Sequence, residues 1–234
     1  MQSENKTALI TGGTGALGSV VVQKFLEENF NVAATYRNEK ELEKFSDGMR
    51  NKILFVKTDL TDEESVRLLF QGAIKRFATL DILINIAGGF AGGKPLKETS
   101  LDELEKMFSL NTKTTFLCTR EFLRSKLENE FGRIINIAAM TQLKPSANKS
   151  AYTISKSGVV ALTQSLAEEL KGSNVTVNAI APSIIHLEEN KQWGRDEDFK
   201  KWVTPEEIAI TMIFLASENA CSINGAVIPM FGGM

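Results

Sequence analysis

Apolar residues along this chain follow two alternating spacings. Short runs rich in β-branched residues alternate with longer stretches in which apolar positions recur every three or four residues. The short runs predict strands over Ala8–Thr11, Asn31–Thr35, Ile53–Lys57, Asp81–Ile86, Arg133–Ala138, Val175–Ile180 and Ala226–Pro229. The longer stretches predict helices over Leu17–Glu28, Glu39–Phe45, Glu63–Phe77, Leu101–Leu127, Ala151–Leu170 and Pro205–Ala216. This alternation is typical of an α/β fold, so we expect a doubly wound, seven-stranded parallel sheet with helices on both faces.

Length and composition indicate one globular domain over residues 1–234. No linker, repeat or low-complexity segment divides the 234 residues, of which 43% are hydrophobic and 24% charged. The net charge of −2 and the lack of a long basic run argue against nucleic acid as a partner. No signal peptide is evident, and no apolar stretch reaches the roughly 18 residues of a membrane span, so we expect a cytoplasmic protein without a membrane partner. Cys118 and Cys221 have neither metal-ligand nor disulfide spacing, which predicts reduced thiols, with Cys118 in the core, and no metal site.

Two stretches interrupt the alternation, Met140–Lys149 and Ser183–Val203. Each follows a predicted strand, and ligands of doubly wound sheets bind beyond the carboxyl ends of the strands. Long loops in compact domains are commonly functional. The longer stretch, at about residues 183–203, is therefore the predicted substrate lid, although a merely mobile surface loop is the alternative.

A glycine-rich turn, Thr11-Gly-Gly-Thr-Gly-Ala-Leu-Gly18, joins the first predicted strand to the first helix. Glycines let the backbone approach a pyrophosphate, and the start of the helix supplies amide donors, so the turn predicts dinucleotide binding. The second strand runs into Tyr36 and Arg37 without the Asp or Glu that binds a ribose 2′-hydroxyl. A basic residue there accommodates a 2′-phosphate, which favours NADP(H). NAD(H) is the alternative if Arg37 is only a solvated charge and Tyr36 only covers the adenine.

Tyr152 and Lys156 stand four residues apart in a predicted helix, so both side chains rise on the same face. An ammonium near a phenol favours the phenolate and lowers the tyrosine pKa from its ordinary value of about 10. The pair then forms an acid/base centre usable near neutral pH. A solvated surface pair with the same spacing is the alternative.

Taken together, these features resemble the short-chain dehydrogenase/reductase family, and the resemblance runs from Lys6 to Gly233. It implies a single Rossmann-fold domain. The family's glycine motif matches at Thr11, Gly12 and Gly18 and departs at Ala16, with Gly15 one place earlier. The other matching segments are Thr58-Asp-Leu60, Asn85-Ile-Ala-Gly88, Ser109-Leu-Asn-Thr112, Asn178-Ala-Ile-Ala-Pro182 and Ile223-Asn-Gly225.

The resemblance also implies roles for individual residues. Tyr152 would donate the proton, Lys156 would lower its pKa and hold the nicotinamide ribose, and Asn111 would hold a water in the proton relay. Asp59 would hydrogen-bond the adenine, and Asn85 would support the fourth strand beside the cofactor. The expected cofactor-binding residues are Thr11, Gly12, Thr14, Gly15, Ala16, Leu17, Gly18, Tyr36, Arg37, Asp59, Leu60, Asn85, Ala87, Gly88, Tyr152, Lys156, Pro182 and Ile185.

The family resemblance further implies a homo-oligomer, a tetramer or a dimer, with the segments Leu101–Leu127 and Ala151–Leu170 at one interface. Packing within the monomer would explain these long amphipathic segments equally well.

This chain departs from the family pattern at the expected substrate. Ala139 stands where the family has a substrate-polarising serine, so one donor to a developing alkoxide is missing. Thr141 is a candidate replacement. Ser183 follows Pro182 in place of the family's usual glycine, and His186 lies where a nicotinamide-contacting threonine is common.

Part of the chain resembles quinonoid dihydropteridine reductase, which also carries alanine in place of the serine. The similar segments are Gly88-Gly-Phe-Ala-Gly-Gly93 and Glu197–Trp202. This resemblance places Phe199 and Trp202 near a flat substrate, although both aromatic residues could equally be lid anchors that pack on the core. The expected substrate residues are Ala139, Thr141, His186, Phe199 and Trp202.

We therefore predict an NADP(H)-dependent oxidoreductase that transfers a hydride from NADPH to a small planar (pterin-like) or carbonyl substrate. One alternative is a 3-oxoacyl or general carbonyl reductase, in which Thr141 or a water replaces the serine. The other is a cofactor-binding sensor or scaffold that has lost catalysis.

Overall fold

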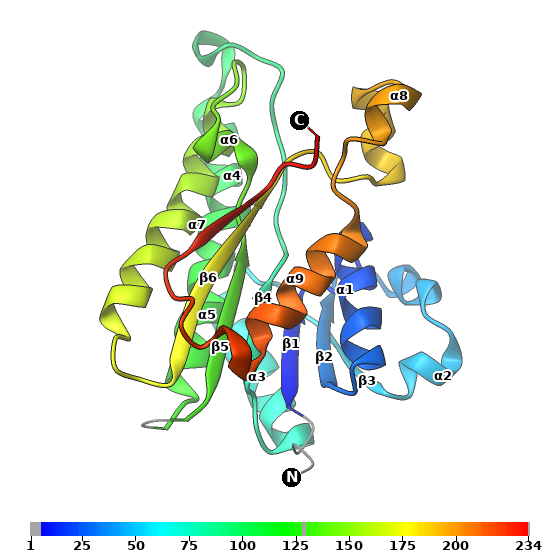
Figure 1. The fold of residues 1–234 in the computed structure, drawn as a ribbon, viewed down its shortest axis with the longest axis vertical. Helices are drawn as coiled ribbons and strands as arrows, with labels where there is room; N and C mark the ends of the chain where they lie inside the picture. Colours follow the sequence, from blue (N-terminus) through cyan, green and yellow to red (C-terminus); the bar gives the residue numbers. More distant parts are fainter. Residues whose placement is uncertain (1–5, 128–129, 234) are drawn as a thin grey trace.

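The computed structural model describes residues 6–127 and 130–233, and its centre is a seven-stranded parallel sheet (Figure 1). The strands lie in the order β3-β2-β1-β4-β5-β6-β7, so the chain begins mid-sheet, winds to one edge and then crosses to the other. Their bounds are β1 Thr7–Thr11, β2 Asn31–Tyr36, β3 Ile53–Lys57, β4 Ile82–Asn85, β5 Gly132–Ile137, β6 Val175–Pro182 and β7 Val227–Met230. The predicted doubly wound α/β fold is confirmed.

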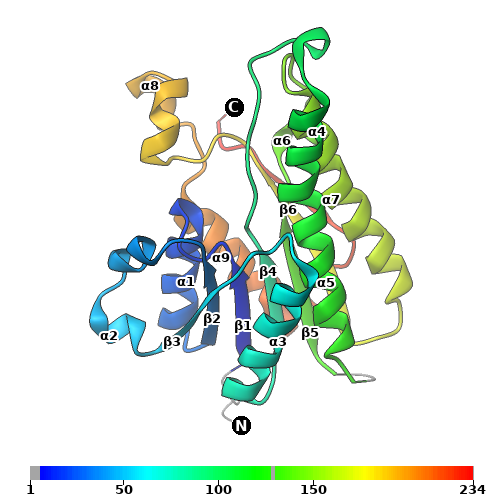
Figure 2. The ribbon, with the colours of Figure 1, turned by 180° about the vertical axis from the view of Figure 1, so that it is seen from behind.

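Helices cover both faces of the sheet, as Figures 1 and 2 show from opposite sides. On one face α1 and α9 pack on the sheet, and on the other face α3 and α5 do so. The main covering helices are α1 Ala16–Glu27, α3 Glu63–Phe77, α5 Thr114–Arg124, α7 Ser150–Glu169 and α9 Pro205–Ala216.

Alternate residues of the central strands belong to different cores. On β1, Ala8 and Ile10 pack toward α1 and α9, whereas Leu9 packs toward α3 and α5, and all three are fully buried. A strand covered on both faces buries every residue, which explains the continuous apolar runs that predicted these strands. The predicted core position of Cys118 is confirmed, since its thiol is free and fully buried on α5, while Cys221 is free and exposed.

The predicted helix Leu101–Leu127 is interrupted in the structure. It consists of α4 (Leu101–Phe108), a π-helical turn η3 (Ser109–Lys113) and α5, which ends at Arg124. The hydroxyl of Thr115 donates to the backbone oxygen of Asn111 at 2.7 Å, just beyond the turn. The wide π turn accommodates one extra residue, so the apolar positions before and after it stay on the same face of the helix. The spacing of apolar residues therefore did not reveal the interruption.

Short helices occupy the connections between these elements. They are η1 Glu39–Lys44, α2 Asp47–Arg50, η2 Leu96–Glu98, α6 Met140–Leu143, η4 Glu188–Trp193, α8 Asp196–Phe199 and η5 Glu218–Ala220. Two of them correct the sequence predictions: η1 is a 3₁₀ helix rather than an α-helix, and α6 lies in the stretch predicted to be irregular.

The predicted lid contains η4 and α8 and projects beyond the carboxyl ends of the strands (Figure 1). Its two ends meet, because Ile185 pairs with Val203 and the amide of His186 donates to the oxygen of Val203 at 2.8 Å. The segment is therefore closed at its base. Within the described residues, no helix is both long enough and apolar enough to cross a membrane.

Candidate active site

The turn between β1 and α1 is closed too tightly for side chains at its key glycines. Gly12 has a φ of +65°, and a Cβ there would lie 3.0 Å from the backbone of Ala87. A Cβ at Gly18 would lie 2.0 Å from the oxygen of Gly12. The amide of Gly12 donates to the hydroxyl of Thr35 at 2.8 Å. Glycine is thus required at both positions for the turn to close against the ends of β2 and β4.

The start of α1 is a ready anion site. The helix begins at Ala16 after Gly15, and within the described chain no side chain caps its first amides. Such amides lack partners inside the helix, and the helix dipole adds a positive partial charge. They open into a cavity of about 420 Å³, which a glycine-lined turn borders. This cradle fits the pyrophosphate of a dinucleotide.

The cavity runs from the glycine turn to α7 and brings together most of the predicted cofactor residues and the three predicted catalytic residues. Those on its wall are Gly12, Thr14, Gly15, Ala16, Leu17, Gly18, Tyr36, Arg37, Leu60, Ala87, Gly88, Asn111, Tyr152, Lys156 and Ile185.

Four predicted cofactor residues do not line the cavity, and three of them are buried behind it. The hydroxyl of Thr11 accepts from the amides of Ile86 and Ala87 at 3.1 and 3.2 Å, and so joins β1 to the loop after β4. Buried Asn85 donates to the side chains of Asn136 and Thr119, and Pro182 is buried at the end of β6.

Asp59 is the fourth of these residues. Its carboxylate accepts from the hydroxyl and the amide of Thr61 at 2.7 and 2.9 Å. These hydrogen bonds lower the pKa of Asp59, so the group is an anion at neutral pH. It lies between Thr58 and Leu60, both on the cavity wall.

Tyr152 and Lys156 rise from α7 one turn apart, as predicted, but their pKa values differ from expectation. Burial raises the pKa of Tyr152 to about 12 and lowers the pKa of Lys156 to about 8. The ammonium donates to the oxygen of Ile137 at 2.7 Å. The tyrosine pKa was predicted to be lowered and is instead raised, because burial removes the hydration that would stabilise the phenolate.

Asn111 ties the loop after β4 to α7. Its fully buried side chain accepts from the amide of Gly89 and donates to the oxygen of Gly89 and to the hydroxyl of Ser155, each at 3.0 Å. Ser155 in turn donates to the backbone oxygen of Tyr152 at 2.7 Å. Asn111 thus positions the backbone around Tyr152, and the relay water implied by the resemblance stays a prediction.

The residues predicted near the substrate lie elsewhere. In the described chain none of Ala139, Thr141, His186, Phe199 and Trp202 forms the cavity wall. Ala139 and Thr141 are buried, and the Thr141 hydroxyl has no hydrogen-bond partner among the described residues.

The three lid residues of that set pack on one another. The rings of His186 and Phe199 stack at 5.8 Å, and Phe199 lies 4.8 Å from Trp202. Trp202 is 5% exposed and lies against Gly194, where a Cβ would approach its ring to 2.5 Å. These rings hold the segment together internally, and their role toward a substrate stays a prediction.

Other aromatic residues lie beside Tyr152 instead. Phe90 lines the cavity and contacts the ring of Tyr152 edge-on, with centroids 4.9 Å apart. On its other side Phe90 lies 5.3 Å from Trp193 of η4, which is half exposed. In the sequence, Phe90 stands out only as part of a glycine-rich segment, and no role was predicted for Trp193. The remaining wall residues that were not predicted are Thr35, Glu41, Thr58, Ile86, Gly89, Ile137, Leu187 and Glu189.

Few side chains of the site carry groups that could react or bind charge. The described residues form no group of three or more His, Cys, Asp or Glu side chains that could hold a metal ion. The groups available for chemistry are the phenol of Tyr152, the ammonium of Lys156 and the anion-binding turn.

Comparisons with known proteins agree with this arrangement. The family model for short chain dehydrogenases matches residues 6–198. Glucose 1-dehydrogenase 2 of Bacillus subtilis (strain 168) is 31% identical over 247 residues, covering 98% of this chain and 94% of that protein. Acetoacetyl-CoA reductase of Acinetobacter sp. (strain RA3849) is 30% identical, covering 99% and 98%. The solved structure of ElxO with NADP bound is 31% identical and superposes with a TM-score of 0.90 over 98% of both chains.

Proposed function

Because the chain belongs to the short-chain dehydrogenase/reductase family and is an oxidoreductase, we propose that it uses NADPH to reduce a small planar or carbonyl-bearing molecule. The observation that carries the proposal is the single cavity that joins the anion-binding glycine turn to Tyr152. One end suits the phosphates of a dinucleotide, and the other end places a proton donor beside an aromatic wall.

The choice of NADPH over NADH rests on the end of β2. Arg37 is exposed there on the cavity wall, and no Asp or Glu occupies the last positions of the strand. A guanidinium at this place accommodates a 2′-phosphate. The similar structure of ElxO has NADP bound, which supports the same choice here.

Tyr152 and Lys156 have different roles in the proton transfer that accompanies the reduction. When bound, NADPH supplies a hydride. Tyr152, whose pKa is raised to about 12, is protonated across neutral pH and is therefore ready to donate its proton to the reduced substrate. Lys156, with a pKa of about 8, is mostly charged near pH 7 and stabilises the phenolate left behind. Asn111 keeps the loop after β4 in place around both groups.

The proposed substrate is flat because the aromatic ring of Phe90 lines the cavity beside Tyr152. A conjugated molecule can stack on such a ring, and Trp193 packs against Phe90 without lining the cavity. Alanine at 139 supplies no hydroxyl to polarise a carbonyl. Reduction of a conjugated imine or quinonoid ring needs this help least, which supports a pterin-like substrate.

Reduction of 3-oxoacyl thioesters is the second candidate. The similar acetoacetyl-CoA reductase supports it, and so does the buried Thr141 hydroxyl, which has no partner in the described chain and could serve as the missing donor. The family relationship argues against the third alternative, a sensor without catalysis.

A substrate panel with NADPH absorbance as readout tests the proposal. It contains quinonoid dihydropterin, acetoacetyl-CoA and simple aromatic and aliphatic ketones, with Tyr152→Phe as the matched control. We expect NADPH consumption with the flat substrates in the native enzyme and a loss of at least about a hundredfold in the variant. No consumption with any member, or equal rates in native and variant enzyme, would refute the proposal.

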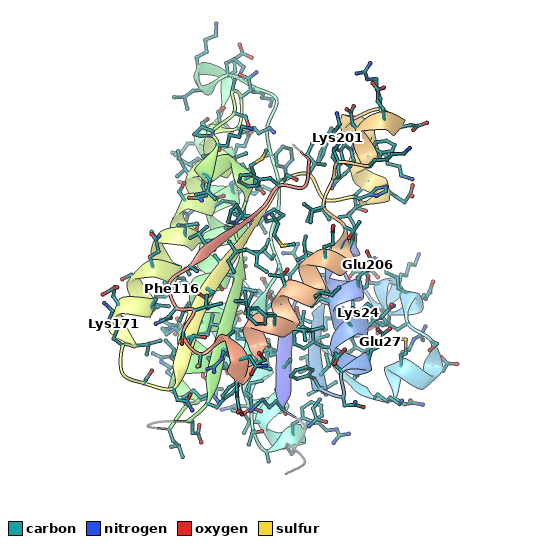
Figure 3. All side chains as sticks on the ribbon, in the orientation of Figure 1. Lys24, Glu27, Phe116, Lys171, Lys201 and Glu206 are labelled. Atoms are coloured by element: carbon teal, nitrogen blue, oxygen red, sulfur yellow. The ribbon has the colours of Figure 1, made fainter. Side chains whose placement is uncertain are left out.

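We also propose a homo-oligomer built on the outer face of α4, α5 and α7. This face exposes large apolar side chains, including Phe108, Phe116 and Ile154, and Figure 3 shows Phe116 at the edge of the molecule. Apolar groups exposed together in this way mark contact surfaces. Light scattering on native enzyme and on Phe116→Glu is expected to show an oligomer and a smaller species, respectively, and a native monomer would contradict the proposal.

A further inference from the structure

Glu41 is the one acidic residue on the cavity wall close to the glycine turn. It belongs to η1, is half buried, and accepts a hydrogen bond from the hydroxyl of Thr14. Arg37 lies on the same part of the wall, at the end of β2. A fixed carboxylate and a guanidinium thus border the same end of the cavity.

The Glu41 carboxylate is held in place by more than one contact. Lys44, one turn later in η1, donates its ammonium to the backbone oxygen of Thr14 at 2.8 Å. Thr14 is therefore bound through both its hydroxyl and its carbonyl, and η1 cannot swing away from the turn without breaking both bonds. Thr14 itself is 1% exposed. Glu41 is consequently a built part of the wall and not a solvated surface charge.

The carboxylate of Glu41 and the guanidinium of Arg37 have opposite effects on a bound phosphate. A carboxylate accepts hydrogen bonds from ribose hydroxyls and repels a phosphate, whereas a guanidinium attracts a phosphate. Folds of this type usually place the discriminating acid at the end of β2. Here that strand ends in Tyr36 and Arg37, and the acid comes instead from η1, five residues beyond the strand.

We propose that Glu41 is a specificity-determining residue that favours the ribose 2′-hydroxyl of NADH and opposes the preference of Arg37 for the 2′-phosphate of NADPH. This inference rests on the proposed function, since it requires the adenosine of the cofactor to lie at this end of the cavity. With Glu41 present, the difference in affinity between NADPH and NADH is smaller than Arg37 alone would set.

Binding constants for NADPH and NADH, measured by titration calorimetry without substrate, test the inference. In Glu41→Gln the ratio of the NADPH Kd to the NADH Kd is expected to fall by about tenfold, the effect of removing one charge contact near a protein surface. Arg37→Gln is expected to raise the same ratio. Glu43→Gln is the matched control, because Glu43 lies on the same short helix, is exposed, and does not line the cavity.

The ratio, rather than either binding constant alone, separates a direct effect of the carboxylate from an effect on the turn, because a loosened turn would weaken the binding of both nucleotides alike. Glu41→Ala serves as a second neutral variant, and circular dichroism checks that each variant is folded.

One result would overturn the inference. Glu41→Gln and Glu41→Ala could leave the ratio within twofold of the Glu43→Gln control, in which case Glu41 only shapes the turn. This result leaves the proposed function intact, because the native enzyme still binds NADPH. A native enzyme that binds neither nucleotide would instead refute the proposed function, and this inference with it.

Discussion

Replacement of Lys156 by methionine is expected to stabilise the fold near neutral pH and to abolish turnover. Lys156 is 5% exposed, and burial lowers the pKa of its ammonium from 10.5 to about 8. Methionine has a similar length and no charge, so it keeps most of the packing and removes the charge from the interior. The enzyme would lose the cation that stabilises the Tyr152 phenolate.

The size of the gain follows from the pKa. At about 1.4 kcal/mol for each pKa unit, the lowering to about 8 corresponds to a penalty of about 3 kcal/mol in the native fold at neutral pH. Loss of the hydrogen bond to the oxygen of Ile137 offsets about 1 to 2 kcal/mol of the gain. The free energy of unfolding is therefore expected to rise by about 1 to 2 kcal/mol in the variant.

The gain depends on pH in a defined direction. The unfolded lysine holds its proton more tightly than the folded one, so the penalty is complete below about pH 8, declines from there to pH 10.5, and is absent above. The advantage of the variant over the native protein is thus expected to shrink by about 2 kcal/mol between about pH 7 and 9.5.

Urea unfolding of both proteins at several pH values measures this difference. Lys171→Met, just beyond the end of α7, is the matched control (Figure 3), since the Lys171 side chain is 67% exposed and pairs with Glu168 on the surface. Its stability is expected to stay within about 0.5 kcal/mol of the native value at every pH. A Lys156→Met variant whose difference from the native protein does not change with pH would refute the reasoning.

Four further substitutions test the site and its supports. Gly18→Ala is expected to lower the free energy of unfolding by at least about 2 kcal/mol in urea and to weaken NADPH binding, because its Cβ would lie 2.0 Å from the oxygen of Gly12. Gly72→Ala, in open space on α3, is expected to raise stability by about 0.5 to 1 kcal/mol, and equal effects of the two substitutions would contradict the assignment. Phe90→Ala is expected to raise KM for flat substrates by about tenfold with little change in thermal stability, and an unchanged KM would remove Phe90 from the site. Trp202→Ala is expected to destabilise the lid by about 3 kcal/mol in thermal unfolding, since it empties a buried space, and a stable variant would contradict its role as an anchor.

The sheet and the glycine turn could be predicted because both depend on local patterns. β1 is apolar at Ala8, Leu9 and Ile10 because the sheet is covered on both faces, and the turn needs glycine where the backbone passes Ala87. The spacing of Tyr152 and Lys156 likewise fixes their common face on α7.

The pKa values of Tyr152 and Lys156 could not be predicted, because the segments that bury the two side chains are distant in the sequence. The oxygen that binds the Lys156 ammonium belongs to β5, and the ring against Tyr152 belongs to the loop after β4. Spacing along α7 carries no information about either neighbour. The sequence therefore predicted attraction between the two groups, whereas their loss of hydration dominates.

The roles of the lid aromatics were also beyond the sequence. Trp193 and Trp202 lie in one polar segment, yet Trp193 is 50% exposed beside Phe90 and Trp202 is 5% exposed. Trp202 is buried because it packs on His186 and Phe199, which lie far apart along the segment and meet only in the folded chain. Glu41 was missed for a related reason, since it is one of several charges in a polar run and only the folded turn brings Thr14 to it.

The π turn at Ser109–Lys113 sets a limit on changes in chain length. A π turn holds one residue more than an α-helical turn, so a one-residue deletion there would yield a regular helix with better local hydrogen bonding. The helices on either side would keep their orientation, because the wide turn alone accommodates the extra residue. The wide turn that brings Asn111 to Gly89 and Ser155 would be lost. A one-residue deletion that a surface loop would tolerate is therefore expected here to make the helix more regular and the enzyme inactive.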